Sequence, residues 1–218
     1  MSIKQKVLGL GLFASVAVAS FATVTASANN REGHFVTTGT AVTIIRSTEP
    51  APDKLEWEIH GWGPGIVCDK HNSEVQNEKE TENELIIFME VADCYTTGTA
   101  IKFPITAKSC PMWFFAAKGT TAATEQTVKF ECIQPIEIHH PGCTIRIPAQ
   151  DNLTTVTYTQ IMLNGKHAIT IDMNVKYTAH FEAGACTALG TVKTGTLKGS
   201  FVVEALTLGG AQANLTVT

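Results

Sequence analysis

Thr-Val-Lys-Phe-Glu-Cys, residues 127–132, is the stretch that decides the fold. Successive side chains of an extended strand point to opposite faces, so Val128, Phe130 and Cys132 would share one face. The polar and charged residues between them would share the other face. Such a two-faced strand is typical of antiparallel sheets, in which one face packs on a core and the other meets water.

The same alternation recurs at residues 143–147, 168–173 and 197–204. Val, Ile, Thr and Phe dominate nearly everything after residue 34, and Gly, Pro and Asn separate the short runs, a composition that favours strands. Parallel βαβ units would need amphipathic helices between the strands, and no convincing one is present. The sequence therefore predicts an all-β fold, mainly an antiparallel sandwich or two packed sheets.

The N-terminal residues predict export. Residues 1–6 carry two lysines and no acid, residues 7–24 are uncharged and mostly apolar, and Ala26-Ser27-Ala28 matches a small-x-small cleavage pattern. This order is typical of a secretory signal peptide, so we expect residues 1–28 to be removed and no membrane span to remain. The alternative, a retained anchor, is disfavoured because an apolar run of about 18 residues only just spans a bilayer.

The rest of the chain is expected to form one domain outside the cell or on its envelope. Residues 29–34 are predicted to be frayed, and the domain to cover residues 35–218, with a possible subdivision into two sheets near residue 135. An acidic stretch at residues 72–84 is predicted to be a solvated loop, since it has little apolar content to pack.

Six cysteines follow the predicted cleavage site. An even number of cysteines in an exported chain favours disulfides. A hairpin formed by segments 110–115 and 126–132 would place Cys110 opposite Cys132, where cross-strand distances suit a disulfide. Pairing of Cys132 with Cys143 is nearly as easy. The set that we favour is Cys110–Cys132, Cys68–Cys94 and Cys143–Cys186, which would stabilise the β domain.

Metal binding is the competing use of these residue types. The stretch His-His-Pro-Gly-Cys at residues 139–143 is the only local cluster of ligand types, and there is no C-x-x-C pair. Zinc sites usually take close ligand pairs from two separate turns, and a second pair is missing. We therefore expect no metal and no other cofactor.

Net charge excludes some classes of partner. Removing residues 1–28 removes two lysines, which leaves 14 basic and 20 acidic side chains and a net charge of about −6 with His neutral. Nucleic acids and anionic membrane surfaces both require a basic face, so neither is an expected partner.

Catalytic signatures are missing from the sequence. The motifs G-x-S-x-G, H-E-x-x-H and G-x-G-x-x-G are absent, as is a phosphate-binding loop. No catalytic residue is predicted, although a pair of carboxylates from distant strands could still hydrolyse a glycoside. The acids available for such a pair are Asp69, Glu90, Asp93, Glu131 and Asp151.

Two tryptophans are the candidate binding residues. Trp57 and Trp62 flank a bend, and their flat rings could stack on sugar rings; the alternative is that they pack in the core. Trp113, in a continuous aromatic run with Phe114 and Phe115, is more typical of a core residue.

The second half of the chain resembles a group of exported proteins of soil actinobacteria. The resemblance rests on FECIQPIEIHHPGCTIRIPAQ at residues 130–150, VTYT at 156–159, YTAHFEAGACT at 177–187 and GTVKTGTLKGSFVVEA at 190–205. It covers roughly residues 35–205, but the acidic stretch is not a feature of the group. The residues that match the group's C-T-[IV]-x-[IV]-P-x-Q segment and later cysteine are Cys143, Thr144, Ile145, Ile147, Pro148, Gln150 and Cys186.

The resemblance implies an exported, cysteine-containing β-protein of an uncharacterised family, and it assigns no catalytic residue. We therefore expect a non-catalytic protein of the cell surface or medium that binds a cell-wall polysaccharide or a surface protein. The alternatives are a secreted hydrolase with carboxylates from separate strands, and an envelope protein that self-associates through sheet edges.

Overall fold

The structure is a computed structural model that describes residues 31–38, 41–46, 54–75, 81–99, 101–107, 109–117, 126–207 and 209–218. The predicted signal peptide, residues 1–28, lies outside the described residues. The fold is all-β, antiparallel and disulfide-stabilised, as predicted.

The strands follow one another with a single short 3-10 helix, η1, among the described residues. Their bounds are β1 Phe35–Thr37, β2 Ala41–Arg46, β3 Leu55–Ile59, β4 Ile66–Val75, β5 Thr81–Glu82, β6 Glu84–Thr96, β7 Lys102–Phe103, β8 Ile105–Thr106, β9 Met112–Phe115, β10 Thr127–Phe130, β11 Ile136–His140, β12 Cys143–Ile147, β13 Gln150–Thr154, β14 Val156–Leu163, β15 Lys166–Gly184, η1 Ala185–Leu189, β16 Val192–Thr207, β17 Gln212–Ala213 and β18 Leu215–Val217.

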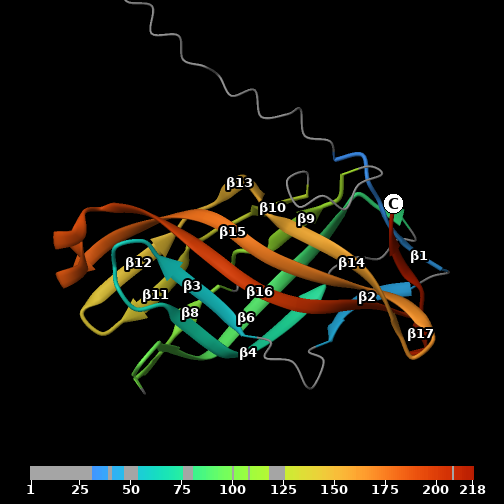
Figure 1. Cartoon of the computed structure of the whole chain (residues 1–218), viewed down its shortest axis with the longest axis horizontal. Coiled ribbons are helices and arrows are strands. Elements are labelled where there is room, and N and C mark those ends of the chain that lie inside the picture. The colour runs from blue at the N-terminus through green and yellow to red at the C-terminus, as the bar shows by residue number, and fades with distance from the viewer. Residues whose placement is uncertain are drawn as a thin grey trace, which may run out of the picture.

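Two long strands, β15 and β16, organise the main sheet. They pair from Ile169↔Val203 to His180↔Val192 and run the length of the molecule in Figure 1. The main sheet has the order β13-β10-β9-β6-β4-β3-β16-β15-β12-β11-β8, so strands from both sides of residue 135 belong to it. A second, three-stranded sheet has the order β18-β1-β5.

The main sheet curls until its parts face one another across the core. Phe114 of β9 meets Phe201 of β16 edge to face, with ring centroids 5.7 Å apart. The phenol of Tyr158 in β14 donates a hydrogen bond to the carbonyl oxygen of Phe115, 3.0 Å away. The side-chain amide of Gln150 bonds both backbone groups of Thr178 and so ties β13 to β15. These contacts make two packed layers from one sheet.

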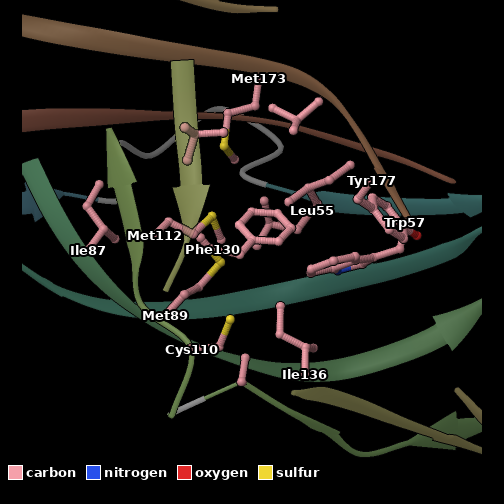
Figure 2. Packing of buried hydrophobic residues seen from close by; sticks show 14 of the residues in the cluster. Leu55, Trp57, Ile87, Met89, Cys110, Met112, Phe130, Ile136, Met173 and Tyr177 are labelled. Carbon is pink, nitrogen blue, oxygen red and sulfur yellow. The ribbon is translucent and has the colours of Figure 1, made fainter. Parts of the chain in front are cut away.

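Alternation along β15 produces much of the core. From Ile169 to Phe181 every second side chain is buried, because period-2 geometry sends alternate residues to the inner face. In Figure 2, Met173 and Tyr177 of β15 lie over the same core as Leu55, Trp57 and Phe130. Burial raises the pKa of Tyr177, so its phenol stays protonated and donates to the carbonyl oxygen of Glu58.

All six cysteines are paired in disulfides. The bridges are Cys68–Cys94, Cys110–Cys132 and Cys143–Cys186, which are the pairs favoured from the sequence. The β9–β10 register runs from Thr127↔Phe115 to Phe130↔Met112 and continues to Cys110 opposite Cys132, which confirms the hairpin argument. Three disulfides indicate an oxidising, extracellular environment.

The acidic stretch is more regular than predicted. We expected a solvated loop over residues 72–84, but β4 extends to Val75 and β6 begins at Glu84. The backbone from Asn72 to Val75 pairs with β6, because an antiparallel ladder satisfies backbone groups whatever the charge of the side chains.

Residues 31–34, before β1, make several contacts with the rest of the fold. Residues 29 and 30 of the segment predicted to be frayed lie outside the described residues. The Arg31 guanidinium lies 3.7 Å from the ring centroid of Phe115. It also donates to Asp151 at 2.6 Å and to the side-chain oxygen of Asn152 at 2.8 Å. The backbone of Gly33 bonds Ala116. Residues 31–34 therefore attach the N-terminal strand to the main sheet.

This attachment predicts a pH-dependent contribution to stability. Burial raises the pKa of Asp151, but hydrogen bonds from Arg31 and the backbone of Asn152 outweigh it and hold the pKa below its ordinary value of 3.8. A carboxyl group whose pKa is lower in the folded than in the unfolded protein stabilises the fold at pH values above its unfolded pKa. This contribution to stability is lost as the pH falls through the folded pKa.

We expect D151N to lower the urea midpoint slightly at pH 7, by less than about 1 kcal/mol in stability, since the carboxylate is partly exposed. The difference in urea midpoint between D151N and the unsubstituted protein should disappear as the pH falls below 3.8, the ordinary pKa of an aspartate. The control is D172N, at an exposed acid of β15. A gap that stays constant from pH 7 to pH 2.5 would contradict the role of the ion pair.

Candidate functional site

Trp57, one of the two candidate binding residues, is part of the core. Its side chain is 1 % exposed, and its ring meets that of Tyr177 edge to face at 5.6 Å. Figure 2 shows it among buried side chains of several strands. The hypothesis that Trp57 stacks on a ligand is therefore wrong, because alternation in β3 points residues 55, 57 and 59 inward.

Trp62 lies instead at the surface, in the connection between β3 and β4. It is half-buried, and its backbone N–H bonds the carbonyl oxygen of Ile59 at 3.1 Å, which closes a tight turn. Gly61 and Gly63 have φ values of 80° and 110°, which glycine adopts without steric cost. These two glycines let the chain reverse on either side of the indole.

Two further rings complete an aromatic cluster at this place. The ring of His140, at the end of β11, meets Trp62 at 4.9 Å and an interplanar angle of 89°. It also meets Phe103 of β7 at 5.2 Å and 75°. Edge-to-face contacts of this kind fix the rings relative to one another. We refer to Trp62, Phe103 and His140 as the Trp62 cluster.

Three turns converge around this cluster. The backbone N–H of Thr97, after β6, bonds the carbonyl oxygen of Gly65 at 2.8 Å. The turn at residues 140–142, between β11 and β12, brings His140 to Trp62. We call residues 60–65, 97–99 and 140–142 the turn surface. These residues are far apart in sequence, so the surface depends on the curl of the sheet.

Hydroxyl groups and one histidine lie at one edge of the turn surface. The imidazole of His60 lies 3.1 Å from the hydroxyl of Thr194 through Nδ1 and 3.4 Å from that of Thr196 through Nε2. On the neighbouring turn, the hydroxyls of Thr96 and Thr99 lie 2.6 Å apart. Both pairs are hydrogen-bonding groups that could contact a polar ligand.

The carboxylates considered for hydrolysis lie in separate interactions with cations. Asp69 pairs with Lys54 at 3.0 Å, Asp93 with Lys102 at 2.7 Å, and Asp151 with Arg31. Glu131 pairs with Lys129, and Glu90 is exposed on β6. A retaining or inverting pair needs two carboxylates facing one another across a substrate. The ion pairs give these four acids different partners, although Lys129, the partner of Glu131, also acts on Asp151.

The histidine–cysteine stretch at residues 139–143 takes no common ligand position. Cys143 is in a disulfide, His139 lies 3.2 Å from Glu137, and His140 is in the Trp62 cluster. Within the described ranges, no group of three or more His, Cys, Asp or Glu side chains is arranged to hold a metal ion. Nor does any helix there have the length and apolarity needed to cross a membrane.

Sequence reasoning missed the partners of Trp62. His140 was considered only as a metal ligand beside Cys143, and Phe103 was not considered at all. Neither alternation nor spacing indicates which turns of a curled sheet meet. The proline and glycine that follow His140 do mark a turn, the one local signal that it could lie at the same end of the molecule as Trp62.

Comparisons with known proteins found no match: no family model fits the chain, and neither the curated proteins nor the solved structures gave a significant hit.

Proposed function

We propose that this chain is an exported β-protein without catalytic activity that binds a cell-wall polysaccharide at the turn surface. The observation that carries the proposal is the half-buried Trp62 ring, fixed by His140 among three converging turns. A rigid aromatic ring loses little conformational entropy when a ligand covers it, so it can contribute much of the binding energy.

Two further features support this proposal. Three disulfides fit a protein that works in an oxidising compartment, where cell-wall polymers are found. The export pattern of residues 1–28 would deliver the chain there. The pairing of Asp69, Asp93 and Asp151 with separate cations favours binding over the alternative of hydrolysis.

The test is co-sedimentation of the purified protein with isolated cell-wall material. We expect W62A to weaken retention in the pellet about tenfold or more, as for an aromatic residue at the centre of a binding surface. The matched control is W113A, because Trp113 is also half-buried but lies on β9, where its ring contacts Lys129. Circular dichroism of each variant should show that the fold is kept.

Retention that is equal in W62A and the unsubstituted protein would overturn the turn surface as the binding site. Protein that stays wholly in the supernatant would overturn wall binding itself. In that case, capture of a surface protein would be the next function to test.

A further inference from the structure

We infer that the turn surface selects uncharged pyranose units and excludes anionic polymers. This inference rests on the proposed function and names the ligand class of that site. Three properties of the turn surface carry it: its charge, its relief and the groups beside the ring.

The turn surface contains no acid and no permanently charged side chain. Its sequences are His-Gly-Trp-Gly-Pro-Gly, Thr-Gly-Thr and His-Pro-Gly. The nearest carboxylate that we identify is Glu58, whose Cγ lies 3.9 Å from a Cβ built on Gly65, and Lys198 pairs with it at 3.0 Å. Lys102, on β7, is paired with Asp93. Apart from Lys193, the charges identified at its edge are thus balanced in pairs, so Lys193 is the one source of a net field that an anion would meet.

Lys193 is the cation that could favour an anionic ligand instead. Its Nζ lies 3.7 Å from a Cβ built on Gly61, beside the Trp62 turn. Lys193 is only partly exposed, and a single ammonium is strongly hydrated and screened at physiological ionic strength, so it adds little to binding. Removing its charge is therefore a direct test of the two ligand classes.

Glycines of the three turns leave open space at their Cβ positions. An ideal Cβ built on Gly63, Gly98 or Gly142 meets no heavy atom within 4 Å. All three have φ between 78° and 110°, so larger residues would be strained there. At these three glycine positions, therefore, no side chain obstructs a wide, flat ligand that lies along the turns.

A pyranose fits both the ring and its surroundings. One face of the sugar presents C–H groups, which suit the π face of Trp62, and its rim presents hydroxyls that can both donate and accept hydrogen bonds. Thr99, in the turn at residues 97–99, and Thr194, beside His60, also carry hydroxyls that can donate and accept. Phosphate and carboxylate groups are instead bound best by charged donors, and residues 60–65, 97–99 and 140–142 include no lysine or arginine.

The experiment measures binding of the full mature chain to three probes by isothermal titration calorimetry: cellopentaose, penta-N-acetylchitopentaose and polygalacturonate. We expect binding of at least one neutral oligosaccharide, with a dissociation constant that changes less than about twofold between 50 and 500 mM NaCl. W62A should weaken it about tenfold or more, whereas K193Q and W113A should leave it unchanged.

Preference for polygalacturonate, with affinity lost in K193Q or at high salt, would overturn the inference. Failure of both neutral probes would also overturn it. If retention on cell-wall material nevertheless depended on Trp62, the proposed function would stand and only the ligand class would fall. If neither neutral probe bound and retention on cell-wall material did not depend on Trp62, the proposed function would be overturned as well.

Discussion

Replacing Cys68 and Cys94 together by alanine is expected to lower the free energy of unfolding by about 4 kcal/mol, since removing a native disulfide costs about 2–5 kcal/mol. This bridge should lie near the top of that range because both cysteines are at most 1 % exposed. The bridge joins β4 to β6, and its two cysteines are the register partners of Leu55 on β3 and Phe103 on β7. The measurement is equilibrium unfolding in guanidinium chloride.

The control is the double replacement of Cys143 and Cys186. That bridge spans 43 residues against 26, so loop closure alone would make it the more stabilising by about 0.4 kcal/mol. If burial decides, the order reverses, because Cys143 and Cys186 are 7 % and 5 % exposed and lie at the end of β12 and in η1. A larger loss in the control variant would contradict our account of the Cys68–Cys94 bridge.

The strands and their pairing could be predicted where the information is local. Residues 127–132 alternate because each side chain responds to the face on which it lies, and a hairpin fixes its own register. The same local argument gave Cys110 opposite Cys132. The pairs Cys68–Cys94 and Cys143–Cys186 were favoured but could not be derived, because they depend on which strands become neighbours.

The candidate site was only half predictable for the same reason. Trp57 and Trp62 are five residues apart and look alike in sequence, yet one is buried and the other lies on a turn. Alternation in β3 settles Trp57 once the strand is known. The ring neighbour of Trp62 is His140, from the end of β11, and β3 and β11 are separated in the order of the sheet, so only its curl brings the two rings together. Contacts between strands that are distant in sequence do not produce a periodic pattern of residues, so they cannot be predicted from alternation.

The acidic stretch shows where composition misled. Glutamate-rich sequence is typical of solvated loops, and the residues from Asn72 to Val75 were assigned to one. Their backbone nevertheless pairs with β6, from Asn72↔Glu90 to Val75↔Ile87. Strand pairing is driven by the neighbouring β6, whose inward side chains Leu85, Ile87 and Met89 are buried. Tertiary context therefore outweighs the low strand propensity of glutamate.

Gly184→Ala is expected to be the most damaging substitution of a single glycine, with a loss of about 3–5 kcal/mol. Gly184 ends β15 with φ of 91° and ψ of −169°, a region that is essentially restricted to glycine and in which an L-residue costs about 1–3 kcal/mol. A Cβ there would also collide with the carbonyl oxygen of Gly142, and would lie 2.6 Å from its carbonyl carbon and 3.1 Å from the nitrogen of Cys143. These are backbone atoms, so no side chain can rotate away, and overpacking adds about 1–3 kcal/mol.

The matched control is Gly210→Ala. Gly210 has φ of 79°, but a Cβ built on it meets no heavy atom within 4 Å. G210A should therefore lower the free energy of unfolding only by the conformational cost, about 1–2 kcal/mol. Guanidinium unfolding of both variants separates the two contributions. Equal losses would show that the β12–β15 junction yields to the extra carbon. A larger loss in G184A, with free thiols detected from Cys143 and Cys186, would show that close approach of the two backbones holds this junction and its disulfide together.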